Sequence, residues 1–170
     1  MKRTHALQLS AFAIACAFLS ATGAGAGEWA VADGGCKVWN PNPTPGETAY
    51  WTGACKNGFV EGVGALEWRR GGKSYERDEG LWRGGRQAGE GSQTWPGGQF
   101  KGQLADSMPQ GQGVLILGET RYEGAFLSGK PHGRGALTNA SGVFDGAWRD
   151  GCFNDGKRRA AFGVALQSCP

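Results

Sequence analysis

Short stretches of alternating apolar and polar residues run along most of this chain, and turn-forming pairs divide them. In the stretch from Trp51 to Trp68, Asn57-Gly58 lies between two such runs. Asn-Gly is the strongest short signal for a two-residue hairpin turn, because both residues tolerate positive φ. Pairs at the same place in later stretches are Gly84-Gly85, Asp106-Ser107, Ser128-Gly129 and Asp150-Gly151. The pattern therefore predicts a series of antiparallel β-hairpins.

The hairpins share a framework of glycines. Each unit has a leading aromatic residue or a substitute for it, a glycine two residues later, and a Gly-x-Gly pair further on in most units. The first glycine is 27 residues from its successor in the first unit, and the later intervals are all 22 residues. These first glycines are Gly53, Gly80, Gly102, Gly124 and Gly146. A regular period in this range indicates stacked repeats rather than one globular core.

A two-residue turn at positions 57 and 58 also predicts the strand register. It places Trp51 opposite Gly64, and the same arithmetic in the fourth unit places Tyr122 opposite Gly135 and Gly124 opposite Gly133. Glycines opposite rings leave room for a ring to lie flat across the backbone. Alternation sends one set of large side chains to one face: Trp51, Trp68, Trp82, Trp95, Phe100, Leu115, Tyr122, Phe126, Leu137, Phe144 and Trp148. The opposite face collects charged residues, as expected for an antiparallel sheet with one wet face.

The segments Tyr122-Glu123-Gly124 and His132-Gly133-Arg134-Gly135, with Gly129 between them, resemble the MORN repeat, the membrane occupation and recognition nexus. The resemblance covers about residues 50 to 157. It implies stacked β-hairpins that form an elongated, twisted or grooved single sheet, an all-β fold. The second unit departs from the pattern at Asp78, which replaces the leading aromatic residue, and the third unit has Ser107 in place of its middle glycine.

The first 26 residues are expected to be a signal peptide. They combine a positively charged start, an apolar stretch over residues 6–21 and the small residues Ala24-Gly25-Ala26. The apolar stretch is shorter than the roughly 20 residues that span a bilayer. Cys16 raises the alternative of a lipoprotein, although the preceding Ala13-Ile14-Ala15 lacks the usual leucine.

The remaining chain divides into three parts. Residues 27–49 contain three prolines and are expected to form an extended N-terminal cap without regular structure. Their segment from Cys36 to Pro43 resembles the lead-in of exported bacterial MORN proteins. Residues 50–159 are expected to hold five repeats, and residues 160–170 a C-terminal cap.

Four cysteines follow the predicted signal peptide, and four cysteines allow three pairings. We predict Cys36–Cys55 and Cys152–Cys169, which would each close a short loop and contribute roughly 3 kcal/mol on a chain-entropy model. Such bonds indicate an oxidising compartment, and we expect a periplasmic or secreted protein. No pair has metal-ligand spacing, so we expect no metal site.

Charge and motifs narrow the function classes. Without residues 1–26 the chain has 16 basic and 15 acidic side chains, so no attraction to nucleic acid is expected. His132 is the only histidine after the signal peptide and is interpreted as a surface residue of its repeat. Glu76, Asp78 and Glu79 lie where the period breaks, in a loop bulge or a functional loop. We predict no catalytic residue and no cofactor.

The leading hypothesis is a non-enzymatic exported scaffold that engages a protein or glycan of the cell envelope. The candidate contact residues are Trp82, Trp95, Phe126 and Trp148, because aromatic side chains dominate interface energetics. The sequence allows two arrangements of the sheet face that carries these aromatic residues. It is either an uncovered patch that binds a partner or part of a curled sheet whose rings bury one another.

The sequence leaves two other function classes open. The family name suggests peripheral association with a membrane surface, but near-zero net charge and the lack of an amphipathic helix do not support it. An enzyme that acts on an envelope polymer through scattered carboxylates is the third hypothesis, and no acid pair can be placed at a productive separation from sequence.

Overall fold

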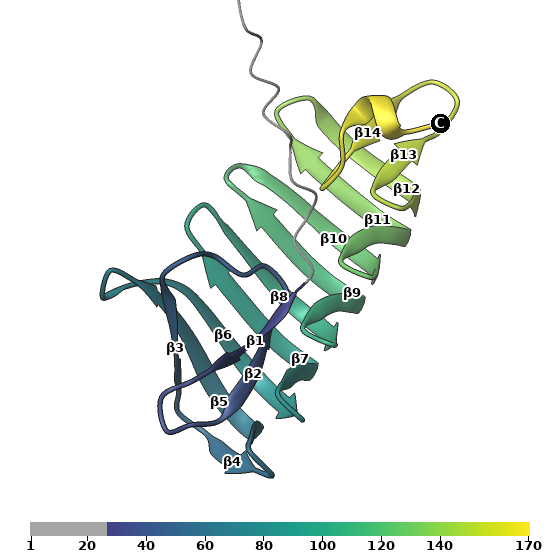
Figure 1. The fold of residues 1–170 in the computed structure, drawn as a ribbon. Helices are drawn as coiled ribbons and strands as arrows, with labels where there is room; N and C mark the ends of the chain where they lie inside the picture. The colour runs from purple at the N-terminus through teal and green to yellow at the C-terminus, as the bar shows by residue number, and fades with distance from the viewer. Residues whose placement is uncertain (1–26) are drawn as a thin grey trace, which may run out of the picture.

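A computed structural model describes residues 27–170, and the predicted signal peptide with Cys16 lies outside the described residues. The described chain is a ladder of antiparallel hairpins, in which each strand from β5 to β14 pairs with its neighbours in sequence (Figure 1). β2 and the shorter strands β3 and β4 also pair with β5. The all-β prediction is confirmed.

The strands differ in length between the ends and the middle of the ladder. They are β1 (Glu28–Val31), β2 (Lys37–Asn40), β3 (Glu47–Trp51), β4 (Ala54–Lys56), β5 (Phe59–Arg70), β6 (Lys73–Arg83), β7 (Arg86–Trp95), β8 (Gly98–Ala105), β9 (Met108–Leu117), β10 (Thr120–Leu127), β11 (Lys130–Asn139), β12 (Gly142–Arg149), β13 (Cys152–Asn154) and β14 (Arg159–Ala161). A single 3₁₀ turn, η1 (Leu166–Ser168), follows within the described part.

All five predicted turn pairs form hairpin turns with positive φ at both residues. Even the unusual pair Asp106-Ser107 adopts φ values of 52° and 64°. The turns stack along one edge of the ladder, because the second residue of each turn after the first donates its N–H to a carbonyl of the preceding unit. These bonds are Gly85 to Val60 at 3.0 Å, Ser107 to Gln87 at 3.0 Å, Gly129 to Pro109 at 2.9 Å and Gly151 to Pro131 at 2.8 Å. Stacked turns hold each hairpin in register with the next.

The predicted register is right beside the turn and wrong beyond it. Tyr122 pairs with Leu137 rather than Gly135, and Gly124 pairs with Gly135 rather than Gly133. The reason is a bulge after the turn of the fourth hairpin, where Gly133 adopts a φ of +88°. The second and third hairpins have the same irregularity. The shift amounts to two residues, so it leaves every side chain on its predicted face. Trp51 is corrected in the same way, since it pairs with Leu66 rather than Gly64.

Glycines form an unbroken row across the middle of the sheet, and rings lie over several of them. The Cα partners in this row run Gly80, Gly91, Gly102, Gly113, Gly124, Gly135 and Gly146. A Cβ atom on Gly135 would lie 2.2 Å from the Tyr122 hydroxyl, and one on Gly113 would lie 2.6 Å from the Phe100 ring. The prediction that rings cover glycines therefore holds through diagonal rather than direct pairs.

The rings gather on one face of the sheet, called here the inner face, and form two apolar clusters. The N-terminal cluster consists of Ala32, Cys36, Val38, Ala49, Trp51, Val60, Leu66, Trp68 and Trp82. The C-terminal cluster consists of Phe100, Leu104, Tyr122, Phe126, Leu137, Trp148, Phe153, Ala160 and Phe162. Edge-to-face contacts dominate both, such as Trp51–Trp82 at 5.5 Å and Tyr122–Trp148 at 5.2 Å between ring centroids.

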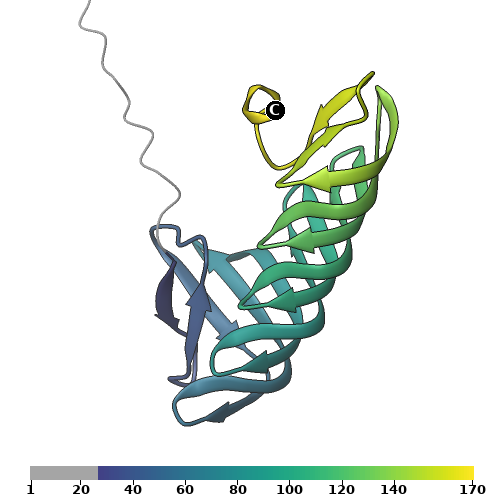
Figure 2. The ribbon, with the colours of Figure 1, turned by 90° about the vertical axis from the view of Figure 1, so that its right-hand side faces the viewer.

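The N-terminal segment has more regular structure than its prolines indicated. β1 and β2 form a hairpin that folds over the inner face, and the end of the chain folds over the same side (Figure 2). The hairpin is ordered by backbone bonds to the stacked turns, since the N–H of Lys37 donates to Gly58 and that of Trp39 to Gly85, both at 2.8 Å. A run of local sequence does not encode these long-range bonds.

Both disulfide pairings that we predicted are present. Cys36–Cys55 ties β2 to the first repeat across a Cα distance of 5.9 Å, and Cys152–Cys169 ties the last residues to β13 across 5.5 Å. Disulfides at both ends indicate an oxidising environment outside the cytoplasm.

Candidate functional site

The structure places the four candidate aromatic residues in two different environments. Trp82, Phe126 and Trp148 are buried, with 1%, 3% and 3% of their surface exposed. They pack against neighbouring rings of the two clusters, so they are structural residues of the inner face and offer no surface to a partner. Trp95 alone is half-buried, at the margin of the C-terminal cluster.

Trp95 lines a cavity of about 490 Å³ on the inner face, where β7, β8 and β9 meet the β2–β3 loop. Phe100 and Leu115 also line it, and the exposed side chains of Met108 and Leu117 form further apolar wall. Its polar groups come from Asn42, Glu76, Gln93 and Ser107. An apolar cavity with a few convergent polar groups is the usual form of a binding site.

Two polar groups of this cavity, Glu76 and Gln93, belong to the second repeat, whose inward positions differ from those of the other repeats. Asp78 stands where Phe100 and Tyr122 stand in the next two units, and Gln93 stands where Leu115 and Leu137 stand. Gln87 replaces the valine, prolines and phenylalanine found at its position elsewhere: Val60, Pro109, Pro131 and Phe153. A polar seam, defined as Asp78, Gln87, Gln93 and Ser107, therefore separates the two apolar clusters.

Hydrogen bonds satisfy most of the polar seam. The backbone N–H of Gln87 donates to Ser107 Oγ at 3.0 Å, and Gln87 Nε2 donates to the carbonyl of Glu79 at 2.9 Å. Gln93 Nε2 donates to Gln87 Oε1 and to the carbonyl of Ser107, both at 3.2 Å. The amide groups are fixed by these contacts, so the seam presents oriented dipoles beside the cavity.

Asp78 is the exception within the seam. Only 4% of the residue is exposed, and its Oδ1 atom has no hydrogen-bond partner. Burial, reinforced by the charge of Glu76, raises the pKa of Asp78 well above its usual range, and a hydrogen bond from Trp68 opposes this. Burial also raises the pKa of Glu76 to about 7, with a further contribution from the charge of Glu47.

Glu47 holds the loop that closes this part of the cavity. Its carboxylate accepts hydrogen bonds from the side chains of Asn40 and Tyr75 and from the backbone N–H of Thr44 at 3.1 Å. Burial and the bond to Glu47 raise the pKa of Tyr75 to about 12. Glu47 thus joins β3 to the β2–β3 loop and to β6.

The acidic residues at the break in the period do not form a loop bulge. Glu76, Asp78 and Glu79 lie within β6, because the extra residues lengthen β5 and β6 to 12 and 11 residues. Glu76 and Asp78 occupy successive inward positions, while Glu79 lies exposed on the outer face. The insertion therefore places two carboxyl groups on the inner face.

His132 belongs to a different, outer feature of the ladder. Its Nδ1 atom accepts a hydrogen bond from the backbone N–H of Asp150, the first residue of the next turn, at 3.4 Å. Glu61 and Gln110 make the same contact in their units, to Gly84 at 2.8 Å and Ser128 at 2.9 Å. His132 is thus one of a series of side chains that link successive turns.

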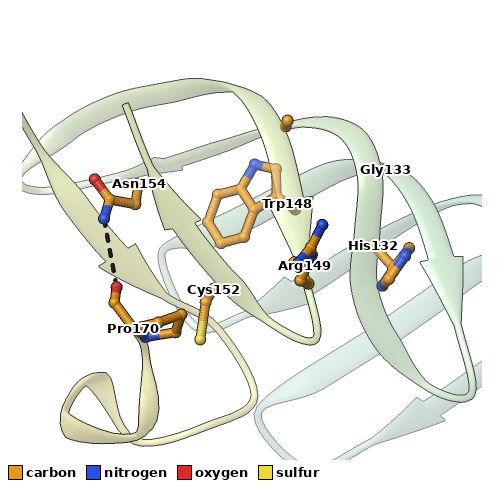
Figure 3. A pocket seen from close by; sticks show the side chains of 8 residues that line it. His132, Gly133, Trp148, Arg149, Cys152, Asn154 and Pro170 are labelled. Atoms are coloured by element: carbon orange, nitrogen blue, oxygen red, sulfur yellow. Dashed lines mark hydrogen bonds between the residues drawn. The ribbon is translucent and has the colours of Figure 1, made fainter. Parts of the chain in front are cut away.

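His132 also lines a second cavity, of about 410 Å³, at the C-terminal end (Figure 3). Trp148, Arg149 and Cys152 line it too, and Asn154 Nδ2 closes one side by donating to the carbonyl of Pro170 at 3.4 Å. This cavity is bounded by the disulfide-tied terminus. Within residues 27–170, no group of acidic, histidine or cysteine side chains is arranged to hold a metal ion.

The comparisons with known proteins agree with the repeat architecture. A family model described as MORN repeat matches residues 79–99, 100–118 and 122–143. The resemblance seen in the sequence is confirmed for these three consecutive repeats. A search of curated proteins found no match. No helix in the described part of the chain is long and apolar enough to cross a membrane.

Proposed function

This chain is a MORN-repeat protein, and on that premise we propose that it is a non-catalytic, exported scaffold that binds a partner of the cell envelope in the cavity beside Trp95. The observation that carries the proposal is the interruption of an otherwise buried row of rings. Between the two apolar clusters the inner face opens into a cavity with exposed apolar walls.

The walls of this cavity come from parts of the chain that are distant in sequence. Pro41 and Asn42 belong to the β2–β3 loop, whereas Leu117 and Gly129 belong to the third and fourth repeats. A partner that enters the cavity would contact several repeats and the N-terminal hairpin together. Repeat arrays commonly use such a composite inner surface for binding.

A scaffold rather than an enzyme is supported by the chemistry of the site. MORN repeats are generally non-catalytic, and the side chains around the cavity are chiefly apolar, with fixed amides. Export is supported by both disulfides, which suit an oxidising compartment. Quantifying the proteins and glycans captured from a cell-envelope extract distinguishes a protein partner from a glycan.

Two leucines offer a matched test. Leu117 lines the cavity and is 36% exposed, whereas Leu127 is 43% exposed and lies on the outer face of β10. The wild type, Leu117→Ala and Leu127→Ala proteins would be immobilised and exposed to an envelope extract of the source cells, and the bound proteins and glycans quantified. We expect Leu117→Ala to reduce the bound partner at least about fivefold, since a truncated interface anchor costs more than about 1 kcal/mol.

Equal capture by the two leucine variants would contradict the proposed site, provided that both retain the wild-type melting temperature. Flotation with anionic liposomes at low salt tests membrane association in parallel. Lipid binding that survives Leu117→Ala would favour a peripheral membrane protein over a scaffold that uses this cavity.

A further inference from the structure

We propose that a protein segment with an extended backbone binds along the stacked turns, donating backbone N–H groups to the carbonyls of Ser107 and Gly129 and placing an apolar side chain in the cavity beside Trp95. This inference rests on the proposed function and names the chemistry of the partner. The observation that carries it is a row of turn carbonyl groups, most of which the chain fills with its own backbone.

The second residue of each hairpin turn contributes one carbonyl group to this row. All five turns have positive φ at both residues, so the carbonyl groups repeat in orientation from one turn to the next. Terminal segments of the chain donate backbone N–H groups to three of them. These bonds are Lys37 to Gly58 and Trp39 to Gly85, both at 2.8 Å, and Phe162 to Gly151 at 2.9 Å.

The two carbonyl groups in the middle of the row receive no backbone donor. Within residues 27–170, the Gly129 carbonyl accepts no hydrogen bond, and the Ser107 carbonyl accepts only the side-chain amide of Gln93 at 3.2 Å. A carbonyl oxygen has two lone pairs, so Ser107 can accept a second bond. Both residues line the cavity beside Trp95. The row of backbone donors is therefore interrupted at the place where the apolar cover of the inner face is also interrupted.

Pro41 explains why the chain does not fill this gap itself. The donors of β2 are Lys37 and Trp39, two residues apart, so the next donor in the series would be residue 41. Proline has no backbone N–H and cannot continue the series. Pro41 instead begins the β2–β3 loop and forms part of the cavity wall. The self-made strand thus ends one turn before Ser107.

Val38 shows what the residue between two such donors does. It lies between Lys37 and Trp39, and its side chain is fully buried in the N-terminal cluster. Successive side chains of a strand point to opposite faces, so a partner that repeated this arrangement would direct one side chain inward. That side chain would enter the cavity between Trp95 and Leu117. The apolar walls select a large apolar residue such as leucine.

The pattern favours a polypeptide over a glycan. A sugar hydroxyl could donate to one carbonyl, but β2 fills successive turns with donors that a polypeptide supplies at every second residue. Peptides that add to a protein in extended form gain affinity from backbone hydrogen bonds and specificity from alternate side chains in pockets. Ser107, Gly129 and the cavity provide both kinds of contact.

The test uses a short capped peptide with leucine at its centre and threonines on both sides. One modified form is N-methylated at the two residues that flank the leucine, which removes the donors to Ser107 and Gly129. The matched control is N-methylated at the leucine itself, whose N–H points to the opposite edge of the strand. Calorimetry with the exported form should show binding weakened about tenfold or more by the flanking methyl groups, and less than about threefold by the control.

Two further measurements locate the bound peptide. The carbonyl ¹³C resonance of Gly129 should move on binding, whereas that of Gly85, which already accepts the N–H of Trp39, should not. Leu117→Ala should weaken the peptide at least about fivefold because it shortens the cavity wall, and Leu127→Ala should leave its affinity unchanged.

The inference is overturned if the peptide does not bind, if the two methylated forms bind alike, or if the Gly129 resonance stays in place. A neutral oligosaccharide that binds in the cavity when the peptide does not would overturn it in favour of a glycan partner. In each case a difference between Leu117→Ala and Leu127→Ala in envelope capture would still support the cavity as the binding site, so the two proposals can fail separately.

Discussion

The second and fourth repeats have the same backbone pattern and opposite interiors. Each has a glycine pair in the central row, a bulge after the turn and a turn with positive φ. The fourth repeat fills its inward positions with Tyr122 and Leu137, both fully buried, whereas the second uses Asp78 and Gln93. Stacking of hairpins therefore does not require an apolar interior at every unit, and one unit is free to carry polar chemistry.

The largest effect on stability should come from removing the buried aromatic ring of the fourth repeat. Tyr122 contacts Phe126 and Trp148 with centroids 5.1 and 5.2 Å apart, and its hydroxyl donates to the carbonyl of Ala125 at 3.0 Å. Tyr122→Ala should lower the free energy of unfolding by about 3 to 5 kcal/mol, because a buried ring leaves a cavity. The matched Asp78→Ala should cost less than about 1 kcal/mol. Urea denaturation measures both, and equal losses would show that the two interiors contribute alike.

The next effect concerns the two terminal segments that fold over the inner face and are tied to it by disulfides. Cys36–Cys55 and Cys152–Cys169 join residues 19 and 17 apart, so serine at both members of either pair should cost about 3 kcal/mol. The consequences should differ in place. Loss of the first bond should loosen the hairpin over Trp82 and speed amide hydrogen exchange in β6, while loss of the second should speed exchange in β12 and β13. Faster exchange spread evenly over the ladder would show that each disulfide stabilises the whole ladder rather than the strands beside it.

Part of this contrast could be predicted from the sequence. The turn pairs gave the hairpins, the alternation gave the faces, and the cysteine spacing gave both disulfides. A comparison of inward positions between units also identifies Gln87 and Gln93, a signal that the leading aromatic residues and the glycines do not carry. The break in the period predicts a loop at Asp78, whereas the extra residues instead lengthen the strands.

Other features could not be predicted from local patterns. Counting from the turn gave the wrong partner for Tyr122, because the bulge at Gly133 depends on a backbone conformation that glycine permits but does not dictate. The burial of Trp82 depends on Val38, which packs in the same cluster only after β2 bonds to the turn at Gly85. The cavity is the space left between two clusters, so it requires the whole ladder.

The polar interior should also respond to pH. The folded-state pKa of Asp78 is raised, so the folded protein binds more protons than the unfolded chain above about pH 4, and stability falls as the pH rises toward the folded pKa. Asp78→Asn removes this charge and should raise the free energy of unfolding by about 1 to 3 kcal/mol at pH 8, with a smaller gain at pH 5. Urea denaturation at the two pH values checks the sign, and a larger gain at pH 5 would contradict it.

The smallest effect would complete a contact that the second repeat lacks. Glu61, Gln110 and His132 each accept the backbone N–H of the next turn, but Ala88 at the equivalent position has no side-chain acceptor for the turn at Asp106. Ala88→Gln should therefore supply the contact that Gln110 makes to Ser128, and it should add about 0.5 kcal/mol because the site is partly exposed. Thermal unfolding compares it with Gln110→Ala, which should lose a similar amount. If Ala88→Gln gives no gain while Gln110→Ala is destabilising, the turn above the polar seam is spaced differently from the others, and the difference between the two repeats extends from their interiors to their backbones.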